Sequence, residues 1–121
     1  MQKCILVVDD DAMNLRRTKM ILEKQQYGVI LAESGEKALQ KLAGEKIDLV
    51  LLDIEMPGMN GIETFEHMKG KYDDIPVIFL TASGYEDDVM SAIRLGAVNY
   101  LKKPFLPQDL LDRIAKEFEI K

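Results

Sequence analysis

Residues 47–61 read IDLVLLDIEMPGMNG, and the apolar half of this stretch decides the fold. The run from Ile47 to Leu52 is interrupted by one acid and ends at a second, Asp53. Such a short run, rich in Leu, Val and Ile, is typical of a strand buried on both faces, as in a parallel sheet. Gly58 and Gly61 follow, and we expect both to serve backbone turns between Asp53 and a helix.

Four more apolar runs of the same kind are spaced along the chain, at residues 4–8, 29–32, 77–80 and 97–101. The stretches between them have apolar side chains three or four residues apart, which is the spacing of one helix face. Strand and helix therefore alternate five times. This alternation predicts a doubly wound α/β domain with a five-stranded parallel sheet, five helices and right-handed crossovers.

The predicted helices have recognisable starts and ends. Asp11 and Ser34 are expected to cap the amino ends of the first and second helices. Gly96 should end the fourth helix, and Pro107 should open the fifth. The apolar stripes are Leu15, Thr18, Ile21 and Leu22; Ala38, Leu39 and Leu42; Ile62, Phe65 and Met68; Val89, Ala92, Ile93 and Leu95; and Leu110, Leu111, Ile114 and Phe118.

Composition limits both the size and the partners of the protein. A chain of 121 residues suits a single domain, 1–121, and leaves no room for an output domain. Hydrophobic residues make up 47% of the chain, which is enough for a core, and its net charge of −5 argues against direct nucleic-acid binding. No apolar run approaches the length of a membrane span, and acids follow the first run too soon for a secretory signal. We therefore expect a cytoplasmic protein without a membrane segment.

Polar residues stand where four of the predicted strands end. Asp9 and Asp10 follow the first strand, Asp53 ends the third, Thr81 ends the fourth and Lys103 follows the fifth. Ligands of an open parallel sheet bind beyond the carboxyl ends of its strands. We therefore expect these five side chains to lie together at one edge of the sheet.

Carboxylates gathered at one edge repel each other, by about 4 kcal/mol for each pair in contact near a protein surface. A cation must therefore lie among them, and Mg²⁺ is suited to carboxylate and carbonyl oxygens. Lys103 adds a positive donor for a phosphate oxygen, and Thr81 adds a hydroxyl. Acids, a metal, a lysine and a hydroxyl together indicate phosphoryl transfer to a carboxylate.

Four motifs resemble, in order, those of the response-regulator receiver domain, and the resemblance covers essentially the whole chain. They are Val7-Val8-Asp9-Asp10, the loop from Leu51 to Gly61 around Asp53, Leu80-Thr81-Ala82, and Tyr100-Leu101-Lys102-Lys103-Pro104-Phe105. The loop around Asp53 is the most specific of the four. The resemblance implies the flavodoxin-like strand order 2-1-3-4-5.

The resemblance also implies a role for each acid. Asp53 would take a phosphoryl group from a phosphohistidine on a sensor histidine kinase or a phosphotransfer protein. Asp10, Asp53 and the main-chain carbonyl of Glu55 would bind Mg²⁺, for which Mn²⁺ would substitute, and Asp9 would help to position the metal. Lys103 would pair with a phosphoryl oxygen, and its bond to the following proline, Pro104, would be cis.

Further residues would carry and time the signal in a domain of this family. Thr81 would swing toward the phosphoryl group and Tyr100 would move inward, which would remodel the face formed by the fourth helix, fifth strand and fifth helix. Glu55 and Ser83 would border the path of the attacking water and tune self-dephosphorylation. Such a domain is no conventional enzyme, although it catalyses its own phosphorylation and dephosphorylation. Its downstream target stays open: an output domain, an effector protein or a homodimer.

Other functions are compatible with parts of the sequence. A magnesium-dependent phosphohydrolase also uses a strand-end aspartate, but the haloacid-dehalogenase pattern has Asp and Thr where this chain has Glu55 and Pro57. A flavin or nucleotide binder needs a phosphate-binding loop after the first strand, where this chain has acids. A receiver that has lost phosphorylation would be expected to lack Asp10, Asp53 or Lys103, and all three are present.

Overall fold

Strands and helices alternate along the part of the chain that the computed structural model describes, which is residues 2–82, 90, 94, 96 and 99–119. The strands are β1 (Cys4–Val8), β2 (Gly28–Ala32), β3 (Leu49–Asp53), β4 (Val77–Thr81) and β5 (Asn99–Lys102). The helices are α1 (Ala12–Glu23), α2 (Gly35–Gly44), α3 (Gly61–Met68) and α5 (Pro107–Glu119). The fourth predicted helix, with its apolar residues at 89–95, falls largely outside the described residues. Within the described ranges, no helix has both the length and the apolar character needed to cross a membrane.

The five strands form one sheet in the order β2-β1-β3-β4-β5, and every neighbouring pair is parallel. This order confirms the predicted flavodoxin-like topology. Because β1 and β3 are neighbours in the middle of the sheet, the segments that follow them begin side by side. The topology therefore places the residues after Val8 beside Asp53 at one edge of the sheet.

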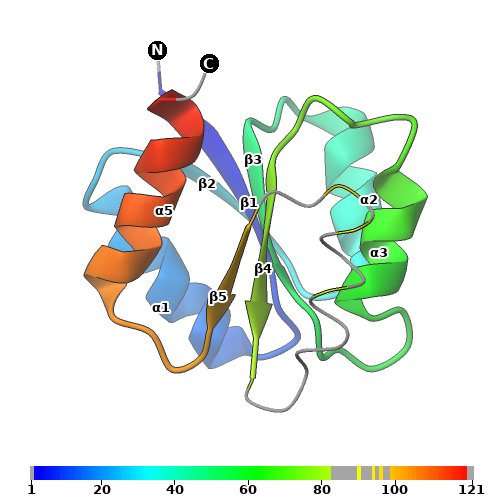
Figure 1. Cartoon of the computed structure of the whole chain (residues 1–121), viewed down its shortest axis with the longest axis horizontal. Coiled ribbons are helices and arrows are strands. Elements are labelled where there is room, and N and C mark those ends of the chain that lie inside the picture. Colours follow the sequence, from blue (N-terminus) through cyan, green and yellow to red (C-terminus); the bar gives the residue numbers. More distant parts are fainter. Residues whose placement is uncertain (1, 83–89, 91–93, 95, 97–98, 120–121) are drawn as a thin grey trace.

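Alternate residues of the central strands face two separate layers of helices. Leu49 and Leu51 of β3 belong to a core cluster with residues of α1 and α5, whereas Val50 and Leu52 belong to a second cluster with residues of α2 and α3. The two helix pairs cover opposite faces of the sheet (Figure 1). All residues of β3 and β4 are buried, as expected for strands covered on both faces, whereas the edge strands β2 and β5 are less buried.

Side-chain caps fix the helix starts beside the sheet edge. The carboxylate of Asp11 accepts a hydrogen bond from the Met13 amide at 2.8 Å, and the Ser34 hydroxyl accepts one from the Lys37 amide at 3.1 Å. Both predicted caps are therefore confirmed. Asp48, the acid inside the apolar run, directly precedes the first residue of β3. Its carboxylate accepts a hydrogen bond from the Cys4 amide at 2.8 Å.

Candidate functional site

Carboxylates from the ends of β1 and β3 meet at one edge of the sheet. One oxygen each from Asp9, Asp10 and Asp53 lies within 4.8 Å of the other two. Asp9 and Asp53 are only 3% and 4% exposed, whereas Asp10 is exposed. Asp9 is held by the Asp11 amide, which donates to its Oδ1 at 2.9 Å. Burial of two negative charges so close together is unfavourable unless a cation balances them.

The side chain of Lys103 supplies a positive charge beside these carboxylates. Its Nζ lies 3.1 Å from Oδ1 of Asp53 and 3.5 Å from Oδ2 of Asp9. The backbone directs it there, because the Lys103 amide donates to the Thr81 carbonyl at 2.7 Å, beyond the last pair of the β4–β5 ladder. The structure thus brings the strand-end acids and the strand-end lysine into direct contact.

Burial and neighbouring charges have opposing effects on the pKa values of Asp53 and Lys103. Burial raises the pKa of Asp53 to about 6, since the opposing effect of Lys103 is outweighed by burial together with the charge of Asp9. Burial alone would lower the pKa of Lys103, but the carboxylates of Asp53 and Asp9 outweigh burial and raise it. At neutral pH, Asp53 is therefore an ionised carboxylate held at a cost in free energy, and Lys103 is a cation.

The three carboxylates open into a cleft of about 630 Å³. Its lining consists of Asp9, Asp10, Asp11, Asn14, Asp53, Ile54, Glu55, Met56, Pro57 and Asn60. Three carboxylates and one ammonium group leave a net charge of −2 at its base (−3 + 1). The three clustered carboxylates offer oxygen ligands, so they fit a small, hard divalent cation such as Mg²⁺. The resemblance ranks Asp10 above Asp9 as a ligand. Both offer an oxygen to the cluster, but Asp9 is buried beside Lys103 whereas Asp10 is exposed.

Thr81, Tyr100 and Pro104 are not among the residues that line this cleft. Thr81 is 2% exposed, and its hydroxyl donates to the Ala82 carbonyl at 3.1 Å. Tyr100 is 40% exposed. The peptide bond between Lys103 and Pro104 is cis. Ser83 and the face that would involve a fourth helix lie outside the described residues.

The two glycines of the loop after Asp53 have different roles, which the sequence did not separate. Gly58 has φ of +74° and serves a turn, as predicted. Gly61 is the first residue of α3 and is not among the described glycines with positive φ, so it lies at the helix start rather than in the loop before it. A Cβ on Gly61 would lie 2.3 Å from the main-chain oxygen of Asp53. Close packing of α3 on the backbone after β3 requires this glycine.

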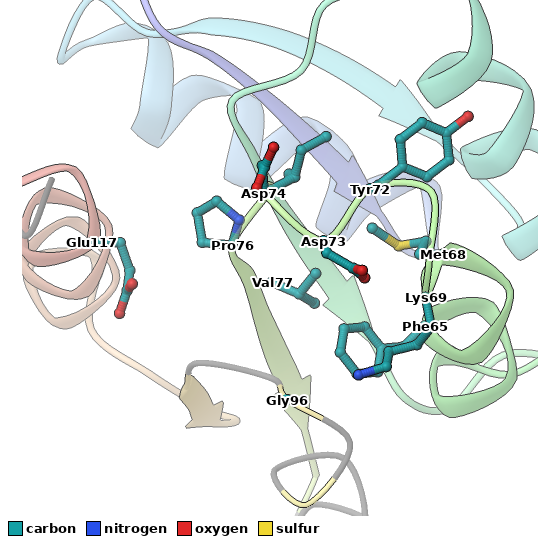
Figure 2. A pocket seen from close by; sticks show the side chains of 11 residues that line it. Phe65, Met68, Lys69, Tyr72, Asp73, Asp74, Pro76, Val77, Gly96 and Glu117 are labelled. Carbon is teal, nitrogen blue, oxygen red and sulfur yellow. The ribbon is translucent and has the colours of Figure 1, made fainter.

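A second hollow, of about 260 Å³, lies away from the carboxylates, and none of the predicted site residues lines it. Figure 2 shows Phe65, Met68 and Lys69 of the α3 region on one side and Glu117 of α5 on the other. Val77, at the start of β4, also lines it, so it lies toward the amino end of that strand. The rule that ligands bind at the carboxyl ends of parallel strands favours the acidic cleft as the functional site.

Comparison with known proteins gives one consistent result. Residues 5–115 match the family model of the response regulator receiver domain. The transcriptional regulatory protein CpxR of Escherichia coli is 44% identical over 110 residues, which are 91% of this chain and 47% of CpxR. The alkaline phosphatase synthesis transcriptional regulatory protein PhoP of Bacillus subtilis is 39% identical over 94% of this chain and 48% of PhoP. The chain thus spans about half the length of these curated relatives.

Solved structures agree in fold over nearly all of the chain. A CheY-like response regulator receiver domain protein from Methanospirillum hungatei superposes with a TM-score of 0.92 at 34% identity, covering 98% of this chain and 95% of that one. NtrX from Brucella abortus gives 0.93 at 28% identity, covering 99% of this chain and 27% of NtrX. With the sheet order and the strand-end acids, these matches show that the chain belongs to the response regulator receiver domain family and is a signalling domain of two-component systems.

Proposed function

We propose that Asp53 is the phosphoryl acceptor of this receiver domain. A carboxylate oxygen of Asp53 would attack the phosphorus of a phosphohistidine on a sensor histidine kinase or a phosphotransfer protein. The new oxygen–phosphorus bond would form as the phosphorus–nitrogen bond breaks, and the imidazole would leave with the electron pair and take up a proton. The product is an acyl phosphate on Asp53.

One observation carries this proposal: Asp53 is nearly buried, yet its carboxylate faces Lys103 at 3.1 Å and lines an open acidic cleft. A carboxylate whose pKa is about 6 is ionised at neutral pH and therefore available as a nucleophile.

The neighbouring residues would divide the remaining work. Asp9, Asp10, Asp53 and the main-chain carbonyl of Glu55 would hold Mg²⁺, which supplies neutralisation of phosphoryl oxygens when bound. Lys103, already within hydrogen-bond distance of Asp53, would move its contact to a phosphoryl oxygen. The same residues would serve dephosphorylation, in which water attacks the phosphorus, the bond between phosphorus and the Asp53 oxygen breaks, and inorganic phosphate leaves.

The phosphorylated state would be read through Thr81 and Tyr100. The Thr81 hydroxyl now donates to the neighbouring Ala82 carbonyl, a local bond that it would exchange for a phosphoryl oxygen. Tyr100 is 40% exposed and would move inward behind it, which would alter the face formed by the fourth helix, β5 and α5. Glu55, which lines the cleft, and Ser83 would tune the lifetime of the phosphoryl group.

The partners follow from the same chemistry. The phosphoryl donor would be a sensor kinase or a phosphotransfer protein, and the reader of the phosphorylated face would be an output domain, an effector protein or a second copy of the chain. The curated relatives CpxR and PhoP are named as transcriptional regulatory proteins, so a transcriptional output is one candidate for the protein to which this domain contributes. We propose a cytoplasmic location for this exchange.

The experiment that tests the proposal is intact-protein mass spectrometry after incubation with acetyl phosphate, with Mg²⁺ or with EDTA. We expect one added phosphoryl group with Mg²⁺ and none with EDTA or in Asp53→Asn. Asp11→Asn is the matched control, because Asp11 lines the same cleft but its carboxylate caps α1, a role that Asn also fills. Beryllofluoride binding in parallel detects a competent site even when hydrolysis of the acyl phosphate is fast. Failure of both would contradict the proposal.

A further inference from the structure

The start of α3 packs on the backbone that carries Asp53. The Gly61 amide donates to the Ile54 carbonyl at 2.9 Å, which closes the loop between them at its base. A Cβ on Gly61 would lie 2.3 Å from the Asp53 carbonyl oxygen, 2.8 Å from Ile54 Cα and 3.0 Å from the Asp53 carbonyl carbon. These are all backbone atoms, so no side-chain rotation would relieve the overlap. Any larger residue at 61 must displace the segment that carries Asp53 and Ile54.

The same segment is held on its other side by the sheet. The Ile54 amide donates to the Leu80 carbonyl of β4 at 3.1 Å. The first turn of α3 is fixed in turn by a capping box, in which the Asn60 side chain accepts from the Glu63 amide at 2.9 Å and the Glu63 carboxylate accepts from the Asn60 amide at 3.0 Å. The backbone of residues 53–54 is therefore held by hydrogen bonds to β4 on one side and to the capped first turn of α3 on the other.

We propose that Gly61 is a positioning residue for the cation site, acting through the backbone of Asp53 and Ile54. Absence of a side chain at 61 lets α3 approach closely enough to fix the Asp53 carboxylate and the main chain of Glu55, which follows Ile54 directly. The inference rests on the proposed function for the identity of the cation and of its ligands. The inference goes beyond the proposed function because it makes the position of those ligands depend on Gly61, a residue that would touch neither the cation nor the phosphoryl group.

Gly61→Ala tests this assignment through Mg²⁺ affinity, measured by isothermal titration calorimetry on protein shown to be folded by circular dichroism. Displacement of ligand-orienting groups weakens metal binding by about 10-fold or more, and we expect a loss of that size. The matched control is Gly70→Ala. Gly70 has φ of +87° with nothing within 4 Å of an added Cβ, so its replacement strains the chain without touching the site. We expect its Mg²⁺ affinity to stay within about twofold of the wild type.

Backbone amide NMR spectra distinguish a local displacement at the site from a general loss of stability. In Gly61→Ala without metal, the amide resonances of Asp53, Ile54 and Glu55 should shift, whereas Gly70→Ala should leave them in place. If Gly61→Ala does not fold, Thr64→Val replaces it. The Thr64 hydroxyl donates to the Asn60 carbonyl at 2.8 Å, so this nearly isosteric change loosens the helix start without adding atoms beside Asp53. We expect Thr64→Val to weaken Mg²⁺ binding by less than about 10-fold.

Wild-type Mg²⁺ affinity in Gly61→Ala, or equal weakening in Gly61→Ala and Gly70→Ala, would overturn the inference and leave the proposed function intact. If Thr64→Val stands in, unchanged affinity there overturns it in the same way. A wild-type protein that bound no Mg²⁺ and accepted no phosphoryl group would remove the proposed function and this inference together.

Discussion

Replacing Asp53 by Asn should stabilise the metal-free protein at neutral pH, although it removes the proposed phosphoryl acceptor. The structure holds the Asp53 carboxylate 4% exposed and close to Asp9 and Asp10, so its ionised form is disfavoured in the fold. Its pKa is accordingly raised, by burial first, from an ordinary value of 3.8 to about 6. Asn has nearly the same shape as a protonated aspartate and carries no charge to bury.

The size of the effect follows from the shift. Two pKa units correspond to about 3 kcal/mol, and solvent screening at the open end of the cleft reduces this to about 1–2 kcal/mol. Because the pKa is raised in the fold, the native state binds the proton more tightly than the unfolded chain between pH 3.8 and about 6. Stability is therefore lost as pH rises through this window, and the full cost is present above it.

Urea denaturation followed by circular dichroism in EDTA measures this effect. At pH 7.5 the free energy of unfolding of Asp53→Asn should exceed that of the wild type by about 1–2 kcal/mol, and near pH 5 the gain should fall to about half. Asp11→Asn, which also removes one negative charge, should show no such gain. An Asp53→Asn variant that was less stable than the wild type at pH 7.5, or a gain that did not depend on pH, would show that burial of the Asp53 charge does not cost stability.

Three further substitutions probe the site. Asp10→Ala should weaken Mg²⁺ binding severely by removing one of three clustered carboxylates, and an unchanged calorimetric titration would contradict the ligand role. Lys103→Ala should still bind Mg²⁺, but beryllofluoride should no longer shift the Tyr100 resonances in NMR spectra; the same shift as in the wild type would reduce Lys103 to a turn residue. Asp11→Ala should lower the free energy of unfolding by about 1 kcal/mol in urea denaturation through loss of the α1 cap; unchanged stability would contradict the capping role.

Local rules predicted the features that depend on neighbours in sequence. Asp11 and Ser34 cap their helices because a short polar side chain ahead of an apolar stripe satisfies free amides whatever the tertiary context. Asp53 and Lys103 were predicted to meet because parallel strands end at a common edge, and the 3.1 Å contact follows from that topology. Strand order itself was implied by the family motifs rather than by periodicity.

Features set by tertiary packing could not be predicted in the same way. Asp9 and Asp10 are adjacent in sequence and of the same residue type. Asp9 is nevertheless only 3% exposed, whereas Asp10 is exposed. This difference depends on the path of the chain after β1, which residue type does not reveal. The role of Gly61 depends on its distance to the Asp53 backbone, and no periodicity encodes that distance. The pKa shift of Asp53 likewise needs the burial that the complete fold provides.

The position of the phosphoryl group can be determined chemically. After reaction with acetyl phosphate and Mg²⁺, borohydride reduces an acyl phosphate on aspartate to homoserine, and peptide mass spectrometry then identifies the altered residue. We expect homoserine at position 53 alone, with Asp9, Asp10 and Asp11 unchanged and no conversion in EDTA. Homoserine at another acid of the cleft, with Asp53 intact, would contradict this expectation.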